Sequence, residues 1–407
     1  MKTVVAFSPR NRWLLLPLFV VAAFTLSAKP ALTDVFRQEK LAAIDAAITN
    51  AIAEKRLPGA VLWLERDGVA YRRAYGQRAV TPKPEAMTED TIFDLASLTK
   101  VVATAPCVMR LIEDGKVKLD APVREYIPEF RRDGKDAITV RQLLTHTSGL
   151  RSGLGRSVNG PNAAISFACQ EKTNSVPGTA FVYSDINFIL LGELVQRVSH
   201  TPLAEFAEEV VYRPLKMRET GYSPTEKLSK RIAPTVGRER GEVHDPTSFG
   251  MGGVAGHAGV FGTAADLARY CRMMLNEGEL DGQRILKPET VRMMTSVQSP
   301  DTVRTRRGLG WDIDSGYSRR GTVFPLGSFG HTGFTGTCLW LDPFSKTFVV
   351  LLSNRVHPDG KGDIRSLQTT VATLAAEAVI GFDFTNVVGA LPSRTNSPAT
   401  RQASPSP

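Results

Sequence analysis

The chain of 407 residues is 42% hydrophobic and 22% charged, an ordinary globular composition that excludes wholesale disorder. Its formal net charge is +9, but five of these positive charges lie near the two ends, at Lys2, Arg10, Arg12, Arg394 and Arg401. The mild excess that remains contains no dense block of Lys and Arg, so no nucleic-acid partner is expected.

The first 28 residues have the pattern of an export signal. Basic residues come first, and the sixteen residues 13–28 then run without a charge and include Pro17. That run is short for a bilayer span but suits a signal core, with Ser27 and Ala28 as small residues at a cleavage point. Residues 1–28 are therefore expected to be a signal peptide or an uncleaved inner-membrane anchor. Either one makes the body periplasmic or secreted, with membrane contact through the N-terminus only.

Cysteine usage favours four buried thiols. Cys107, Cys169, Cys271 and Cys338 form no C-x-x-C pair, which argues against a zinc or thioredoxin-like site. In an exported protein they could form disulfides with three connectivities. A core of this size needs no covalent staples, so buried apolar thiols are the favoured interpretation.

The first predicted elements are a helix over residues 34–54, with Asp34 as its cap, and a strand over Gly59–Arg66. A turn at 67–68 lets residues 69–75 return as a hairpin partner. Mostly helical segments follow from about 97 to 290.

Strands return late in the chain, at residues 329–333, 338–342 and 347–354, and a closing helix is predicted over 364–380. Residues 389–407 hold four prolines and no aromatic residue, and are expected to be a disordered tail.

This order predicts an α+β fold. Strands from both ends can complete one antiparallel sheet, covered on one face by the terminal helices, with the helical middle as an insertion at about 105–290. The alternation of strand and helix expected of a parallel doubly wound sheet is absent. The folded domain is expected to span residues 33–385.

Ser97 and Lys100 are the first candidates for chemistry. If a helix begins near Ser97, the two side chains share one face, one turn apart. A serine hydroxyl needs an adjacent base, and a lysine amine can act as one if burial keeps it neutral. By itself S-x-x-K is a weak signal, because a surface serine beside a solvated lysine has the same spacing.

A second candidate group is Tyr183 and Asp185, at the N-terminal edge of an apolar helical run. A tyrosine with a depressed pKa can pass a proton between nucleophile and leaving group. A carboxylate two positions on can orient the lysine and the substrate. The alternative is a buried tyrosine beside a helix-capping aspartate.

A third candidate group lies in residues 329–336, Phe-Gly-His-Thr-Gly-Phe-Thr-Gly, which suggests an edge strand whose glycines let a substrate approach. His331 and Thr332 would bond an acyl donor, with Gly333 beside them. The backbone N–H groups of Phe334 and Ser97 would form an oxyanion hole.

Together S-x-x-K, Y-x-D and H-T-G resemble the motifs of the serine β-lactamase and penicillin-binding protein superfamily. The resemblance covers about residues 35–385, extends to segments 143–150 and 256–261, and lies on the class C and DD-peptidase side. It looks closest to the subgroup that contains penicillin-binding protein 4B. It implies a β-lactamase/transpeptidase-like fold, with Ser97, Lys100 and Tyr183 as catalytic residues and no cofactor.

The resemblance implies an exported serine hydrolase that forms an acyl-enzyme, with a D-Ala-D-Ala peptide of peptidoglycan as the expected substrate. Asp185 replaces an Asn of class C enzymes, which favours a protonated lysine and shifts the base role toward Tyr183. His331 replaces their Lys, so β-lactam hydrolysis is less expected. The alternatives are a β-lactamase, a carboxylesterase and a non-catalytic cell-wall binding protein.

Three further polar residues, His244, Asp245 and His257, are candidate metal ligands. Their spacing matches no ligand pattern typical of zinc, so no metal is expected. His146 is expected to brace a turn beside the active site.

Overall fold

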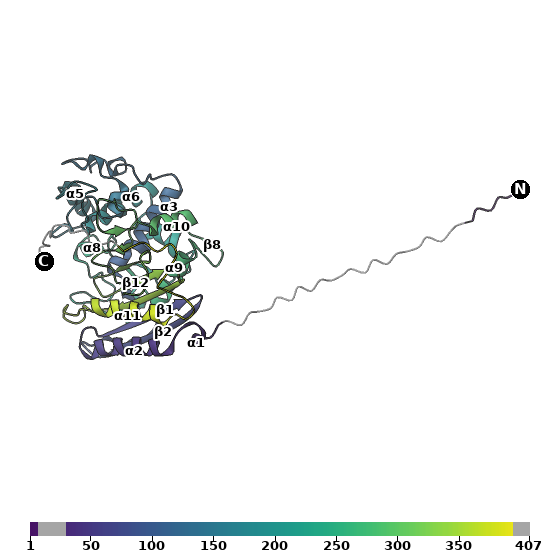
Figure 1. Ribbon diagram of the computed structural model, residues 1–407. Coiled ribbons are helices and arrows are strands. Elements are labelled where there is room, and N and C mark those ends of the chain that lie inside the picture. Colours follow the sequence, from purple (N-terminus) through teal and green to yellow (C-terminus); the bar gives the residue numbers. More distant parts are fainter. Residues whose placement is uncertain (7–29, 394–407) are drawn as a thin grey trace.

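The computed structural model describes residues 1–6 and 30–393, so the expectations for residues 7–28 and 394–407 lie outside the described residues. An antiparallel sheet of eight strands forms the centre (Figure 1), in the order β3-β2-β1-β13-β12-β11-β10-β9. Its strands are β1 (Gly59–Arg66), β2 (Val69–Ala79), β3 (Glu85–Ala86), β9 (Arg306–Arg307), β10 (Asp312–Asp314), β11 (Phe329–Thr332), β12 (Cys338–Asp342) and β13 (Thr347–Ser353).

The helices cover both faces of this sheet. The α-helices are α1 (Leu32–Val35), α2 (Gln38–Ala53), α3 (Ala105–Glu113), α4 (Val140–Leu144), α5 (Pro161–Gln170), α6 (Asp185–Ser199), α7 (Leu203–Ala207), α8 (Pro246–Gly250), α9 (Ala264–Leu275), α10 (Pro288–Thr295) and α11 (Arg365–Ala378). Short 3-10 or π turns are η1 (Ala96–Leu98), η2 (Lys100–Thr104), η3 (Val123–Glu125), η4 (Lys135–Ala137), η5 (Glu208–Tyr212) and η6 (Glu226–Arg231).

Strands from the two ends of the chain lie side by side in the sheet. β1 pairs with β13 in antiparallel register, from Ala60 opposite Ser353 to Arg66 opposite Thr347. The predicted late strands agree with β11, β12 and β13 to within one residue. The α+β fold with one sheet assembled from sequence-distant strands is therefore confirmed.

The side chains of β1 alternate between two cores, because successive residues of a strand point to opposite faces. Leu62 and Leu64 belong to the core beneath α2 and α11, which lie against each other on one face of the sheet (Figure 1). Val61 and Trp63 belong to the larger core beneath the helical region. A strand buried on both faces reads as a continuous apolar run.

Three expectations about elements were wrong. The helix predicted over 34–54 is interrupted because Phe36 forms a β-bridge with Val379, so Asp34 lies in α1 and Arg37 precedes α2. The strand β11 lies between β12 and β10 and is not an edge strand. The middle also contains β-structure: a small sheet of β4 (Phe93–Asp94), β6 (Val260–Gly262) and β5 (Gly221–Tyr222), and a hairpin of β7 (Glu279–Leu280) and β8 (Gln283–Arg284).

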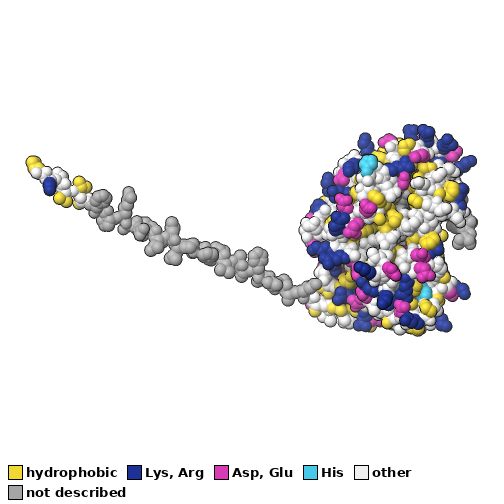
Figure 2. Space-filling view, turned by 180° about the vertical axis from the view of Figure 1, so that it is seen from behind, with side chains coloured by type: hydrophobic (Ala, Val, Ile, Leu, Met, Phe, Trp, Pro, Cys, Tyr) yellow, Lys and Arg dark blue, Asp and Glu magenta, His cyan; other side chains and the backbone are white. Residues whose placement is uncertain are grey.

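The surface charges and the state of the cysteines agree with the expectations from composition. On the face shown in Figure 2, basic and acidic side chains are interspersed. All four cysteines are buried and free. Within the described ranges no helix is long and apolar enough to span a bilayer.

Candidate active site

Ser97 is the middle residue of the short 3-10 turn η1, just ahead of the π turn η2. The predicted single helix is replaced by the 3-10 turn η1, the π turn η2 and then α3. Ala96, directly before Ser97, has a φ of 47°, a left-handed conformation that few non-glycine residues adopt. The spacing still brings the two side chains together, because Lys100 Nζ lies 3.0 Å from Ser97 Oγ.

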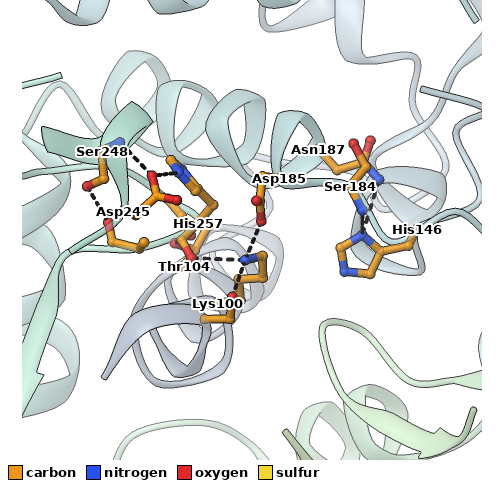
Figure 3. Close-up of polar contacts among 12 residues, drawn as sticks. Lys100, Thr104, His146, Ser184, Asp185, Asn187, Asp245, Ser248 and His257 are labelled. Carbon is orange, nitrogen blue, oxygen red and sulfur yellow. Dashed lines mark hydrogen bonds and ion pairs between the residues drawn. The ribbon is translucent and has the colours of Figure 1, made fainter. Parts of the chain in front are cut away.

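Lys100 is fully buried, and three oxygen atoms surround its amino group, of which those of Asp185 and His257 can be followed in Figure 3. Nζ lies 2.7 Å from Asp185 Oδ1, 2.9 Å from the carbonyl oxygen of His257 and 3.0 Å from Ser97 Oγ. Asp185 is the first residue of α6, and His257 lies in the loop before β6. Because Asp185 and His257 occupy two directions around Lys100 Nζ, the third direction of the amino group faces the hydroxyl of Ser97.

The Lys100 amine is charged in the resting protein. Burial lowers its pKa, but the carboxylate of Asp185 and the oxygen of Tyr183 outweigh burial, so the pKa of Lys100 is raised above its ordinary value. This direction agrees with the effect expected of Asp185. It differs from the idea that burial keeps the amine neutral, and Lys100 therefore donates to Ser97 Oγ.

Tyr183 is a neutral phenol. Burial is the largest cause that raises its pKa; the charge of Asp185 also raises it, while Lys100 and hydrogen bonding with Ser97 lower it. The net pKa of Tyr183 is raised, so the depressed value expected of a proton shuttle was wrong. A neutral phenol can still relay a proton, because its oxygen accepts one proton while it releases its own.

His146 supports Tyr183 from behind. The two rings pack with centroids 4.5 Å apart. The backbone N–H of Ser184 donates to His146 Nδ1 at 3.0 Å, and the N–H of Val182 donates to the His146 carbonyl at 3.0 Å. Burial lowers the pKa of His146 well below its ordinary value, so the ring is neutral. His146 thus braces the turn that carries Tyr183.

The third motif ends β11. The strand β10 pairs with β11 at one position, Asp312 opposite Gly330, so His331 and Thr332 extend beyond that pair. His331 Nδ1 shares a hydrogen bond with the Thr332 carbonyl oxygen at 2.8 Å. Burial lowers the pKa of His331 well below its ordinary value, and the nearby charges of Arg307 and Lys100 lower it further. This neutral ring supplies no positive charge to a substrate.

Packing inside the protein requires the glycines of this motif. A Cβ on Gly330 would lie 2.2 Å from the Trp340 ring, and one on Gly333 would lie 2.1 Å from Thr337 Oγ1 and 2.6 Å from the Leu95 carbonyl oxygen. The expectation that these glycines make room for substrate is therefore corrected. Thr337 Oγ1 also donates to the Leu95 carbonyl at 3.0 Å, which ties the turn between β11 and β12 to the segment before η1.

One cavity of about 670 Å³ brings the predicted residues together. Lys100 contacts Ser97 from the protein interior. The predicted residues that line the cavity are Ser97, Tyr183, Asp185, His331, Thr332, Gly333 and Phe334. The oxyanion hole stays a prediction, since it concerns the position of a substrate oxygen.

The cavity wall also contains charged residues that no sequence motif predicts. Arg307 and Asp312 are both buried and form an ion pair with Nη1 3.2 Å from Oδ2. The guanidinium of Arg355 lies 4.5 Å from the centroid of the exposed Phe334 ring. These residues stand in no motif, so no local signal marks them.

Two of the three candidate metal ligands, Asp245 and His257, form a hydrogen-bonded pair. Within residues 1–6 and 30–393, no group of three His, Cys, Asp or Glu side chains is placed to hold a metal ion. His257 Nε2 lies 2.9 Å from Asp245 Oδ1, and both residues line the cavity.

A family model described as Beta-lactamase matches residues 44–372, the range that contains Ser97, Lys100, Tyr183 and the third motif. The chain belongs to the β-lactamase family. The fold agrees, because a solved class C β-lactamase mutant superimposes with a TM-score of 0.68 at 21% identity, over 83% of this chain and 97% of that one.

Two of the relatives are about one third identical to this chain. "Putative D-alanyl-D-alanine carboxypeptidase" of Escherichia coli K12 is 32% identical over 404 residues, covering 86% of this chain and 91% of the relative. "N-acetylmuramyl-L-alanine amidase" of Bacillus subtilis 168 is 33% identical over 372 residues, covering 80% and 83%. This member of the β-lactamase family is a serine hydrolase of the β-lactamase and penicillin-binding protein superfamily.

Proposed function

We propose that this protein is an exported carboxypeptidase of the D-Ala-D-Ala type, which acts on peptidoglycan stem peptides through an acyl-enzyme on Ser97. The observation that carries the proposal is the placement of Lys100 Nζ, 3.0 Å from Ser97 Oγ and 2.7 Å from Asp185 Oδ1, behind a cavity that Tyr183 also lines. The two relatives named for D-alanyl-D-alanine and N-acetylmuramyl-L-alanine bonds support a peptidoglycan substrate.

In the acylation step Ser97 Oγ attacks the carbonyl carbon of the penultimate D-Ala, and the bond to the terminal D-Ala nitrogen breaks. The proton of Ser97 passes to the Tyr183 oxygen while the phenol proton passes to the leaving nitrogen. Lys100, held as an ammonium by Asp185, stabilises the negative charge that develops on the Ser97 oxygen.

In the deacylation step water attacks the acyl carbon and the bond to Ser97 Oγ breaks. Tyr183 relays the water proton back to Ser97, which restores the resting enzyme. Because Asp185 keeps Lys100 protonated, Lys100 offers no free amine to activate that water. Release of a bulky, poorly placed acyl group should therefore be slow.

The end of β11 suits an extended peptide. Because β10 pairs with β11 only at Gly330, a substrate strand can add beside His331 and Thr332 through main-chain hydrogen bonds. His331 is neutral, so the positive charge near a substrate carboxylate comes from cavity arginines such as Arg319 and Arg355.

Export is part of the same proposal, because a peptidoglycan substrate lies outside the cytoplasm. It is supported by the N-terminal pattern of basic residues followed by an uncharged run over 13–28. The proposed location is the periplasm or the exterior, with an uncleaved N-terminus as the alternative means of attachment to the inner membrane.

A panel of three substrates tests the proposed function. Turnover of a peptide ending in D-Ala-D-Ala, of nitrocefin and of a p-nitrophenyl ester is compared, together with covalent labelling by a fluorescent penicillin. The proposal expects labelling and a preference for the peptide. Preference for nitrocefin or the ester would replace it with a β-lactamase or a carboxylesterase, and the absence of any adduct would favour a non-catalytic binding protein.

A further inference from the structure

Three successive carbonyl groups, those of residues 256, 257 and 258, accept hydrogen bonds from two parts of the fold, the π turn η2 and the helix α8. This run of acceptors forms the floor behind the serine, in the loop before β6. The donors are, in order, Thr104 Oγ1 at 2.6 Å, Lys100 Nζ at 2.9 Å and Ser248 Oγ at 2.9 Å. The middle acceptor therefore belongs to the amine that contacts Ser97.

Gly256 presses this loop directly onto α6. A Cβ at this position would lie 2.0 Å from the carbonyl oxygen of Phe188 and 2.9 Å from the backbone nitrogen of Gly192. The helix α6 begins with Asp185, the other fixed acceptor of Lys100. The two acceptors of Lys100 thus come from backbone segments that are packed against each other.

The side chain of His257 anchors the loop from the opposite side. Its ring is buried, and Nε2 lies 2.9 Å from Asp245 Oδ1 (Figure 3). Asp245 also caps α8, because the same oxygen accepts the N–H of Ser248 at 2.7 Å. Although burial raises the pKa of Asp245, the adjacent His257 and the N–H of Ser248 outweigh it, so the carboxyl stays ionised.

We propose that the Asp245–His257 pair is a positioning device for Lys100: it holds the 257 carbonyl against Nζ so that the amine faces Ser97. The inference rests on the proposed acyl-enzyme function. Asp185 alone fixes one direction of Nζ and leaves rotation about that contact. The 257 carbonyl removes this freedom, and the imidazole holds that carbonyl in place through its contact with Asp245.

Two amide substitutions distinguish loss of the contact with Asp245 from loss of the imidazole itself. In His257→Gln the amide nitrogen takes the place of Nε2 and can donate to Asp245, whereas in His257→Asn it takes the place of Nδ1 and cannot reach. The measurements are the acylation rate constant and the pre-covalent dissociation constant for a fluorescent penicillin, both from the concentration dependence of labelling.

We expect His257→Asn to lower the acylation rate constant by about tenfold to a hundredfold, the cost typical of a misplaced reacting group, with the dissociation constant within about twofold. His257→Gln should stay within about threefold of the wild type. The matched control is His357→Ala, which removes another buried histidine, one whose Nε2 accepts the Val80 N–H at 3.1 Å. It should lower the melting temperature and leave the acylation rate constant unchanged.

Three results would overturn the inference: a wild-type acylation rate in His257→Asn, an equal loss in His257→Gln, or an equal loss in the His357→Ala control. Failure of the proposed function looks different. In that case the wild type forms no adduct with penicillin, ester or peptide, and the inference falls with it.

Discussion

The ion pair between Lys100 and Asp185 makes a prediction about stability as a function of pH. With 2.7 Å between Nζ and Oδ1, the Coulomb attraction is about 6 kcal/mol at an effective dielectric constant of ~20. Removing the charges from water costs several kcal/mol. We therefore expect Asp185→Asn to destabilise the protein by about 1–3 kcal/mol at pH 6.

The sign of the pH dependence follows from the pKa of Lys100 in the folded wild type and in the folded Asp185→Asn variant. In the wild type the pKa of Lys100 is raised, so the pair stabilises the fold below the ordinary pKa of 10.5 and loses that contribution only above it. In Asp185→Asn burial dominates and lowers the pKa of Lys100, which penalises folding at low pH and relieves the penalty as pH rises. The gap between the two proteins should shrink from pH 6 to pH 10.

Urea unfolding of both proteins at pH 6, 8 and 10 measures this gap. Glu65→Gln is the matched control, because Glu65 pairs with Arg272 at 2.6 Å and an arginine keeps its charge throughout this range. Its gap to the wild type should stay constant. If the Asp185→Asn gap is also constant, Lys100 does not change its ionisation when Asp185 is removed, and the statement that Asp185 keeps Lys100 protonated is wrong.

Four further predictions concern chemistry, location and packing. Ser97→Ala should abolish covalent labelling and leave thermal unfolding nearly unchanged; intact-mass adducts in that variant would exclude Ser97 as the nucleophile. The wild type should hydrolyse nitrocefin well below about 10 s⁻¹ and accumulate a penicilloyl adduct, and His331→Lys should improve β-lactam acylation more than ester acylation; fast turnover by the wild type would instead identify a β-lactamase. Cell fractionation should find the protein outside the cytoplasm, and recovery of full-length protein in the cytosol alone would contradict export. Gly330→Ala should destabilise the fold by about 1–3 kcal/mol in urea unfolding, because its Cβ would meet Trp340 at 2.2 Å; wild-type stability would show that β11 has room there.

Local spacing predicted a large part of this protein. The contact between Ser97 and Lys100 follows from three-residue spacing on a turn, whether that turn is α, 3-10 or π. The strands β1 and β13 were predictable because both are apolar runs bounded by turns. The order of the elements also predicted that strands from both ends of the chain join one antiparallel sheet, as β1 and β13 do.

Tertiary structure alone decided the ionisation state of Tyr183 and the contacts that support the site. The pKa of Tyr183 is raised because burial and Asp185 act on it together, and the sequence shows neither burial nor distance. The pairs Asp245–His257 and His146–Tyr183 join segments that no periodicity connects. Sequence patterns report neighbours along a helix or strand, whereas electrostatics and packing depend on which segments the whole fold brings within a few ångströms.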